Sequence, residues 1–300
     1  MADIRGLQLL YQLNLRGTLA AAADALYLSH SAASHRLAVL EREVGVPVTE
    51  RIGRRLQLTE TGAALAACAQ RLQHDIETTD AVIEQARGTV AGPVRIGLFQ
   101  TAALRILPQL LQELRDDHPG VVLESTQTLA AAALASVQTG ELDLAVVPSY
   151  QRPAPPQPAG TLLHQPLYTD HWFLVLPPAH PLSRGAGPVD LAELRAENWI
   201  AGETVTHFLA PLCRDAGFEP RVVHHSSDYT VMTTLVSLGH GISFMPLIAE
   251  LSALLPPVAA RRLTIPGAHQ TVLAVRRESS VGRPAVDAVW RLMLRRGQEI

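Results

Sequence analysis

Hydroxyl, imidazole and guanidinium groups gather in one short stretch near the start of the chain. The side chains there that could contact a nucleic acid are Ser29, His30, Ser31, Ala32, Ser34, His35 and Arg36. Small hydroxyl and methyl groups allow close approach to phosphates and base edges, and an arginine can reach a guanine or a phosphate. These residue types favour DNA binding, provided that a single helix presents them together.

The surrounding sequence predicts the helices that would present these groups. An amphipathic helix over residues 4–16 is followed by a short second helix that begins at Thr18, itself a member of the predicted DNA-facing set. Ser29 is a good N-cap for a third helix that runs to about Glu43. Two short helices joined by a three-residue turn are typical of the helix-turn-helix arrangement. Alanine-rich helix pairs also pack as plain bundles, which is the alternative interpretation.

A second cationic group follows the third predicted helix. Residues 51–59 are predicted to form a tight turn between two short extended pieces, with Arg51, Arg54 and Arg55 on or beside the turn. A basic turn directly after a recognition helix would grip the flanking phosphate backbone, as the wing of a winged helix-turn-helix does. A solvated arginine face is the alternative.

The overall charge and the absence of lysine limit the possible functions. The net charge is −3, so any DNA contact must come from a local patch. All 25 cationic residues are arginine. This composition excludes a Schiff-base lysine and the phosphate-binding lysine of a P-loop.

No residue cluster points to catalysis or to a bound metal. Cys68 and Cys213 lie far apart, which argues against a disulfide framework and a zinc site, and both are expected to be buried apolar residues. A redox-sensing thiol is the alternative. Adjacent His224 and His225 would point to opposite faces of a strand. No Gly-x-Ser-x-Gly motif occurs, so we expect neither an enzyme nor a cofactor.

The apolar pattern predicts a protein of the cytoplasm without a membrane partner. The apolar share is 47%, but no apolar run approaches the roughly 18 residues that a membrane span needs. The N-terminus also lacks the pattern of a signal peptide.

A long helix is predicted to follow the DNA-binding domain, which we place at residues 1–58. This helix starts after the N-cap Thr59 and forms a linker over residues 59–88. Its apolar residues repeat at close to heptad spacing: Leu65, Leu72, Ile76, Val82 and Ile83. Such spacing favours pairing with a second copy of the helix. A core helix of the next domain is the alternative.

Residues 89–300 alternate between strand and helix patterns, which predicts a bilobed α/β domain. The first lobe comprises about residues 93–148 and 267–300, with a parallel sheet and a helix interrupted near Pro108. The second lobe comprises about residues 161–265 and includes helices over 207–217 and 247–255. The chain is expected to cross between the lobes near residues 147–149 and to return near 263–267. Ligands in open α/β sheets bind in the cleft at the carboxyl ends of the strands.

Several segments carry a family resemblance. TLAAAADALYLSHSAASHRLAVLEREVGV and ERIGRRLQLTETG resemble the N-terminal domain of LysR-type transcriptional regulators. The segments at 140–145, 180–182, 217–220 and 235–246 are similar to the effector domain of that family, which shares the periplasmic-binding-protein fold. The chain departs from the family pattern at His30-Ser31, where Gln-Pro is common, and at Val48-Thr49, where Leu-Phe is common.

The resemblance implies a function and two sets of site residues. Dimers or tetramers would bind a partly palindromic double-stranded operator, and a small-molecule effector in the cleft would modulate them. Ser34, Arg36 and residues 51–55 take DNA-facing positions by this resemblance. The implied effector-binding residues are Gln100, Thr101, Thr128, Ser149, Thr204 and Ser227, with Phe244 or Pro246 as an apolar wall. The expected effector is a small polar metabolite with one carboxylate.

A second function remains possible on the sequence alone. The chain could be a solute-binding or enzymatic α/β protein that carries a helical protein-interaction appendage. Binding to DNA that weakens with salt would separate the two hypotheses.

Overall fold

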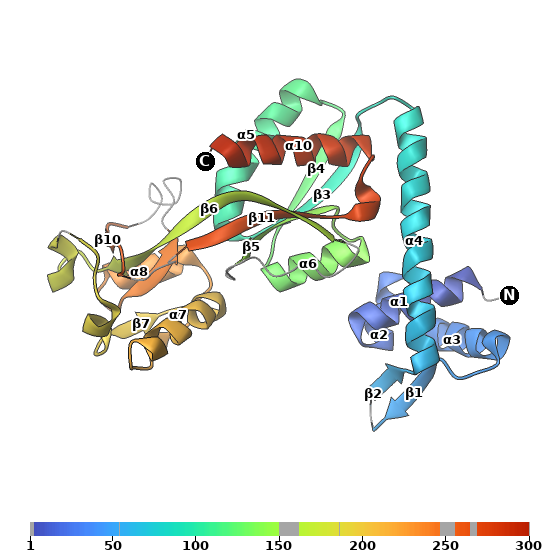
Figure 1. Ribbon diagram of the computed structural model, residues 1–300, viewed down its shortest axis with the longest axis horizontal. Helices are drawn as coiled ribbons and strands as arrows, with labels where there is room; N and C mark the ends of the chain where they lie inside the picture. Colours follow the sequence, from blue (N-terminus) through green and yellow to red (C-terminus); the bar gives the residue numbers. More distant parts are fainter. Residues whose placement is uncertain are drawn as a thin grey trace.

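Three helices lie together in the N-terminal domain (Figure 1), and their apolar side chains share one small core. The computed structural model describes residues 3–53, 55–149, 162–185, 187–246, 256–264 and 269–299. The three helices are α1 (Ile4–Arg16), α2 (Leu19–Ala25) and α3 (His30–Val44). Ser29 caps α3 as predicted, since its hydroxyl oxygen accepts a hydrogen bond from the backbone N–H group of Ala32. Thr18, expected as the first residue of the second helix, is instead the N-cap of α2 and accepts a hydrogen bond from the Ala21 N–H group.

The predicted wing is a two-stranded antiparallel hairpin of β1 (Thr49–Ile52) and β2 (Arg55–Leu58). Glu41 of α3 fixes its position. One carboxylate oxygen of Glu41 accepts hydrogen bonds from the N–H groups of Val48 and Thr49, at 3.0 and 3.1 Å, and from the Thr49 hydroxyl group. Val48 is fully buried. The Val48-Thr49 departure from the family pattern therefore affects how the wing packs on α3.

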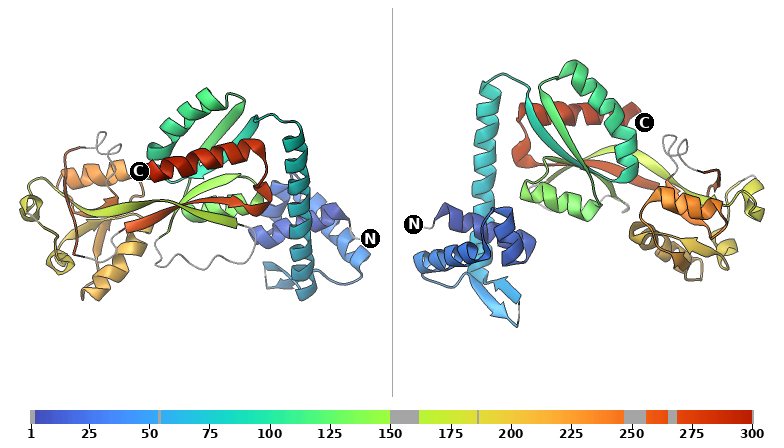
Figure 2. Two further views of the ribbon diagram at one scale, coloured as in Figure 1. Left: turned by 45° about the horizontal axis from the view of Figure 1, so that its top comes forward. Right: turned by 180° about the vertical axis from the view of Figure 1, so that it is seen from behind.

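A long helix, α4 (Glu60–Ala86), connects the N-terminal domain to the rest of the chain. The Thr59 hydroxyl oxygen accepts a hydrogen bond from the Gly62 N–H group and caps the helix. Figure 2 shows from two sides that α4 stands beside the C-terminal domain, whose second lobe lies at the far end from α1–α3. Four large apolar side chains of α4 remain exposed in the single chain: Leu72, Ile76, Val82 and Ile83.

The first lobe is built on a mixed sheet. In the described part of the chain, seven strands pair in the order β10-β6-β11-β5-β3-β4, with β9 beside β6. The three parallel strands are β3 (Gly92–Leu98), β4 (Val121–Gln127) and β5 (Leu144–Ser149). The long strands β6 (Leu162–Leu176) and β11 (His269–Arg277) join them in antiparallel pairing.

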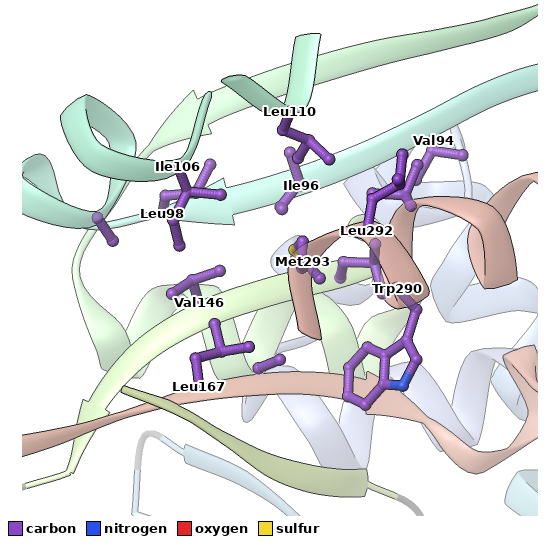
Figure 3. Packing of buried hydrophobic residues seen from close by; sticks show 14 of the residues in the cluster. Val94, Ile96, Leu98, Ile106, Leu110, Val146, Leu167, Trp290, Leu292 and Met293 are labelled. Carbon is purple, nitrogen blue, oxygen red and sulfur yellow. The ribbon is translucent and has the colours of Figure 1, made fainter. Parts of the chain in front are cut away.

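Helices cover both faces of this sheet. Helices α5 (Gln100–Asp117) and α10 (Pro284–Glu299) pack on one face, where Ile106 and Leu110 of α5 meet Val94, Ile96 and Leu98 of β3 (Figure 3). Helix α6 (Ala130–Thr139) covers the other face through Ala133 and Val137. Because β3, β4 and β5 run parallel, their carboxyl ends lie at one edge of the sheet, and apolar burial on both faces holds them in place.

The second lobe has its own core around Trp172, Trp199 and Phe244. Its elements are β7 (Asn198–Ile200), α7 (Glu203–Asp215), β8 (Arg221–His224), α8 (Tyr229–Ser237), β9 (Ser243–Pro246) and β10 (Ala259–Arg261). Short 3-10 helices lie at Pro181–Arg184, Leu191–Leu194 and Glu278–Ser280. Strands β7 and β8 pair in parallel. No helix in the described ranges is long and apolar enough to cross a membrane.

The structure corrects three expectations. Helix α5 continues through Pro108, because the apolar contacts of Ile106 and Leu110 hold both sides of the proline in the core. The expected crossing near 147–149 was wrong: β6 first joins the first-lobe sheet and enters the second lobe near Trp172, where its partner changes from β11 to β9. Helix α7 begins at 203, before the expected start at 207. The expected helix over 247–255 lies outside the described residues.

We predict that Glu41→Ala loosens the wing, because three donors would lose a shared acceptor. The local free energy of opening should fall by about 1–3 kcal/mol. Hydrogen exchange of the backbone amides in β1 and β2 measures this change. Glu50→Ala is the control, since Glu50 is exposed on the same strand. Equal exchange rates in the two variants would contradict the role of Glu41.

Candidate DNA interface and ligand cleft

Helix α3 separates a buried face from a polar face. Ala33, Leu37 and Leu40 are buried against the core. On the other side Ser29, His30, Ser31, Ala32 and His35 are exposed, and Ser34 and Arg36 are partly exposed. The structure therefore brings the predicted DNA-facing residues of this helix together on one surface, while their contact with DNA stays a prediction.

Two arginines next to this surface have free guanidinium groups. Arg36 on α3 and Arg51 on β1 make no hydrogen bond or ion pair with any described residue. Arg54 and the side chain of Arg55 lie outside the described part of the structure. Glu41 joins α3 to β1 through the hydrogen bonds given above. The two free cationic groups are thus carried by directly connected elements.

A cavity of about 270 Å³ lies between the two lobes. Its walls are mainly apolar, with polar groups on five side chains. The first lobe contributes Phe99, Gln100, Gln127, Thr128, Leu129, Ala130 and Pro148, and the second lobe Gly202, Val205, Ser227, Tyr229 and Met232. The structure thus places a cavity at the carboxyl ends of β3, β4 and β5, as the fold class predicts.

Four helices begin at the wall of this cavity: α8, which Asp228 caps, and three helices without a capping side chain. Helices α5, α6 and α7 start after Phe99, Leu129 and Gly202, none of which makes a side-chain capping hydrogen bond. The first backbone N–H groups of such helices have no partner within the helix. Helix starts also carry a partial positive charge. Among the described residues, no arginine or histidine lines the cavity, so backbone groups supply the positive potential.

Gln100 connects the two lobes at this cavity. Its side-chain carbonyl accepts a hydrogen bond from the Tyr229 N–H group at 3.2 Å, and its amide lies 3.5 Å from an Asp228 carboxylate oxygen. Burial alone would raise the pKa of Asp228, but hydrogen bonds from the N–H groups of Thr230 and Val231 and from Gln100 bring that pKa below its usual value. Asp228 is therefore an ionised cap of α8.

The predicted effector-binding residues fall into two groups. Gln100, Thr128 and Ser227 line the cavity. Thr101 is fully buried, and Ser149 adjoins the lining residue Pro148 without lining the cavity itself. The backbone of Thr204 lies in the first turn of α7, but its side chain is outside the described structure.

Phe244 and Pro246 do not form the apolar wall of the cleft. Phe244 is fully buried in the second lobe, with its ring 5.3 Å from that of Trp172 and 5.9 Å from that of Phe208. Strand β9 lies beside β6 inside this lobe, so its large side chains fill the core. The apolar wall is instead formed by residues such as Phe99, Leu129 and Met232. Phe99 directly follows β3, and Leu129 lies two residues after the end of β4; this position after a predicted strand could have identified both from the sequence.

The two cysteines lie in different domains. Cys213 of α7 is fully buried, and burial together with the nearby Glu219 carboxylate raises the pKa of its thiol to about 12. Cys68 lies on α4 and accepts a hydrogen bond from Arg71. No group of three or more histidine, cysteine, aspartate or glutamate residues that could hold a metal ion occurs in the described ranges.

Comparison with known proteins agrees with this arrangement of a polar helix, a wing and a ligand cleft. The family model described as "LysR substrate binding domain" matches residues 87–298, and "Bacterial regulatory helix-turn-helix protein, lysR family" matches residues 4–63. The chain belongs to the LysR family. It is a DNA-binding transcriptional regulator with an effector-binding domain, as the resemblance predicted.

Similar proteins are named as regulators and not as enzymes. A "Probable hydrogen peroxide-inducible genes activator" of Mycobacterium avium is 29% identical over 75% of this chain and 71% of its own length. The "DNA-binding transcriptional dual regulator OxyR" of Escherichia coli is 24% identical over 82% of this chain and 80% of its own length. These relatives and the family models favour the regulator over the enzymatic alternative.

Solved structures of this family share the fold. A full-length OxyR variant from Pseudomonas aeruginosa is similar with a TM-score of 0.66 and 23% identity, covering 98% of this chain and 95% of that one. CbnR in complex with its target DNA has a TM-score of 0.56 and 21% identity, covering 98% of this chain and 99% of that one. The winged helix-turn-helix and the bilobed α/β domain are thus confirmed as the fold of this LysR-family chain.

We predict that Cys213 is chemically inert in the folded protein. With a pKa of about 12, the thiol is thiolate only to about one part in 10⁴ at pH 8, and the thiolate is the reactive form. In a Cys68→Ser variant, iodoacetamide and hydrogen peroxide should leave Cys213 unmodified by mass spectrometry until urea unfolds the chain. Modification of native Cys213 within minutes would show that this thiol is accessible and activated.

Proposed function

We propose that two or four copies of this chain bind a partly palindromic operator in the cytoplasm, and that a ligand in the cleft between the lobes changes that binding. The proposed domains are residues 1–58 for DNA, 59–88 for dimerisation and 89–300 for the ligand. The observation that carries the proposal is the polar face of α3 with free guanidinium groups beside it. Two-fold symmetry would deliver one α3 helix to each half-site.

The exposed apolar residues of α4 support self-association. Leu72, Ile76 and Ile83 are separated by four and seven residues, and Val82 is 60% exposed. A second copy of α4 would remove this apolar surface from water.

The proposed DNA-contacting set comprises the N-cap of α2, the polar face of α3 with its N-cap, and the wing: Thr18, Ser29, His30, Ser31, Ala32, Ser34, His35, Arg36, Arg51, Arg54 and Arg55. Arginine contacts to phosphate release counterions, so binding should weaken with salt. His30 and Ser31 are the exposed positions at which the chain departs from the family pattern. They support an operator preference of its own.

The cavity supports a ligand with one carboxylate, as expected, but its mainly apolar wall favours a mostly apolar body over the expected polar metabolite. Aromatic and aliphatic side chains form most of the wall, and the polar groups belong to Gln100, Gln127, Thr128, Ser227 and Tyr229. Three uncapped helix starts favour one negative group. The ligand would change DNA binding only through a difference in affinity for two arrangements of the lobes.

We predict that Arg36→Ala and Arg51→Ala weaken binding to the DNA directly upstream of the gene. Each change should lower the slope of log K against log salt by about 1. Fluorescence anisotropy of the full chain over a salt series measures both affinity and slope. Arg115→Ala is the control, since Arg115 is exposed on α5 of the C-terminal domain. Unchanged slopes in both test variants would contradict the proposed interface.

We further predict that small aromatic and aliphatic monocarboxylates raise the melting temperature more than their neutral amides do. Thr128→Val and Ser227→Ala should each lower carboxylate affinity by about tenfold, because each removes one hydrogen bond to a charged group. Thr126→Val, at an exposed position of β4 that does not line the cavity, is the control. Acids and amides that bind equally well, or no stabilisation by any acid of the panel, would count against this ligand class.

A further inference from the structure

Tyr27 has a backbone conformation that is unfavourable for tyrosine. It lies in the turn between α2 and α3 with φ 53°, and it is the one residue other than glycine with positive φ in the described part of the chain. Three hydrogen bonds end α2 at this point: Leu26 N–H to Ala23 O, Tyr27 N–H to Asp24 O and Leu28 N–H to Ala23 O. This type of helix end requires a left-handed residue, and glycine adopts that conformation without steric cost.

The same domain uses glycine at its other left-handed turns. Gly17, Gly45 and Gly53 have φ values of 71°, 77° and 63° at the ends of α1 and α3 and in the wing. Tyrosine at the fourth left-handed position therefore raises the free energy of the folded backbone, a cost that glycine would avoid.

The Tyr27 side chain makes no contact in the described part of the folded chain that would offset this cost. It is 98% exposed, and it makes no hydrogen bond or ring contact with any described residue. A strained residue with a free side chain is most easily explained by a contact with another molecule.

The position of Tyr27 beside the start of α3 points to DNA as that molecule. Tyr27 lies two residues before Ser29, the N-cap of α3, and three and four residues before the exposed His30 and Ser31. The phosphate backbone runs along the edge of the groove that receives a recognition helix, and tyrosine hydroxyl groups are among the donors that bind phosphate oxygens.

We propose that Tyr27 is a further DNA-contacting residue, whose phenol hydroxyl group donates a hydrogen bond to a backbone phosphate beside the groove that α3 enters. The inference rests on the proposed role of α3. The contact is uncharged and releases no counterion, so it adds affinity at every salt concentration without changing the salt slope. In this respect Tyr27 differs from Arg36 and Arg51.

The test compares Tyr27→Phe and Tyr27→Gly with the wild-type full chain. Tyr27→Phe should lower the affinity for operator DNA about fivefold or more, with an unchanged slope of log K against log salt, because only the hydroxyl group is lost. Tyr27→Gly should bind DNA at least as weakly as Tyr27→Phe, yet melt at a higher temperature, since glycine removes the left-handed cost. Opposite changes in stability and DNA affinity cannot arise from a damaged fold.

Three results would overturn the inference. The first is a Tyr27→Phe variant that binds DNA as tightly as the wild type. The second is a lowered salt slope in that variant, and the third is a changed oligomeric state of Tyr27→Gly by light scattering, which would assign the side chain to a protein interface. Failure of the wild-type chain to bind DNA in a salt-dependent manner would instead overturn the proposed function itself.

Discussion

A buried arginine at the end of β11 joins the two halves of the chain. The Arg277 guanidinium group donates hydrogen bonds to Glu77 of α4 at 3.0 Å and to the carbonyl oxygens of Leu142 and Val137 at 2.8 and 2.5 Å. Ser279 donates to the same carboxylate. Arg277 is only 8% exposed, and a buried charge that loses its partner costs several kcal/mol. Helix α4 is therefore held with Glu77 against the end of β11.

Further contacts extend this junction to both neighbouring domains. Arg283 donates to Asp143 at 2.8 Å and to Glu84 of α4 at 3.3 Å; burial alone would lower its pKa, but these two carboxylates raise it. Arg16 of α1 forms an ion pair with Glu141 at 2.6 Å, and the Tyr11 hydroxyl group donates to the Gln138 carbonyl oxygen. The same lobe thus holds α4 and the N-terminal domain, and β11 extends from its second-lobe end to the arginine that fixes α4. A ligand that moves the lobes would act on this strand.

Features that depend on neighbouring residues alone, such as helix caps and apolar spacing, were predicted correctly from the sequence. The capping residues Ser29 and Thr59 marked the starts of α3 and α4, and apolar spacing marked the buried face of α3. Side-chain direction in the second lobe was not predictable, because Phe244 fits a cleft wall or a core equally well until its neighbours are known. The shared strand β6 was missed for a similar reason, since pairing with distant β11 and β9 decides where it lies. The place of Phe99 and Leu129 in the cavity wall was easier to predict, because both lie shortly after a strand end, where a helix begins.

The net charge of −3 misleads as a guide to DNA binding because most described arginines of the C-terminal half serve the fold. Arg276 pairs with Asp287, Arg277 with Glu77, and Arg296 with Glu113 and Glu299. Such guanidinium groups contribute little positive potential outside the protein, since each has a carboxylate beside it. Arg36 and Arg51 have no such partner among the described residues. The affinity for DNA therefore depends on the number of unpaired cationic side chains on one surface and not on the net charge. Because all of these side chains are arginine, each has a planar guanidinium group that can form two parallel hydrogen bonds to a phosphate.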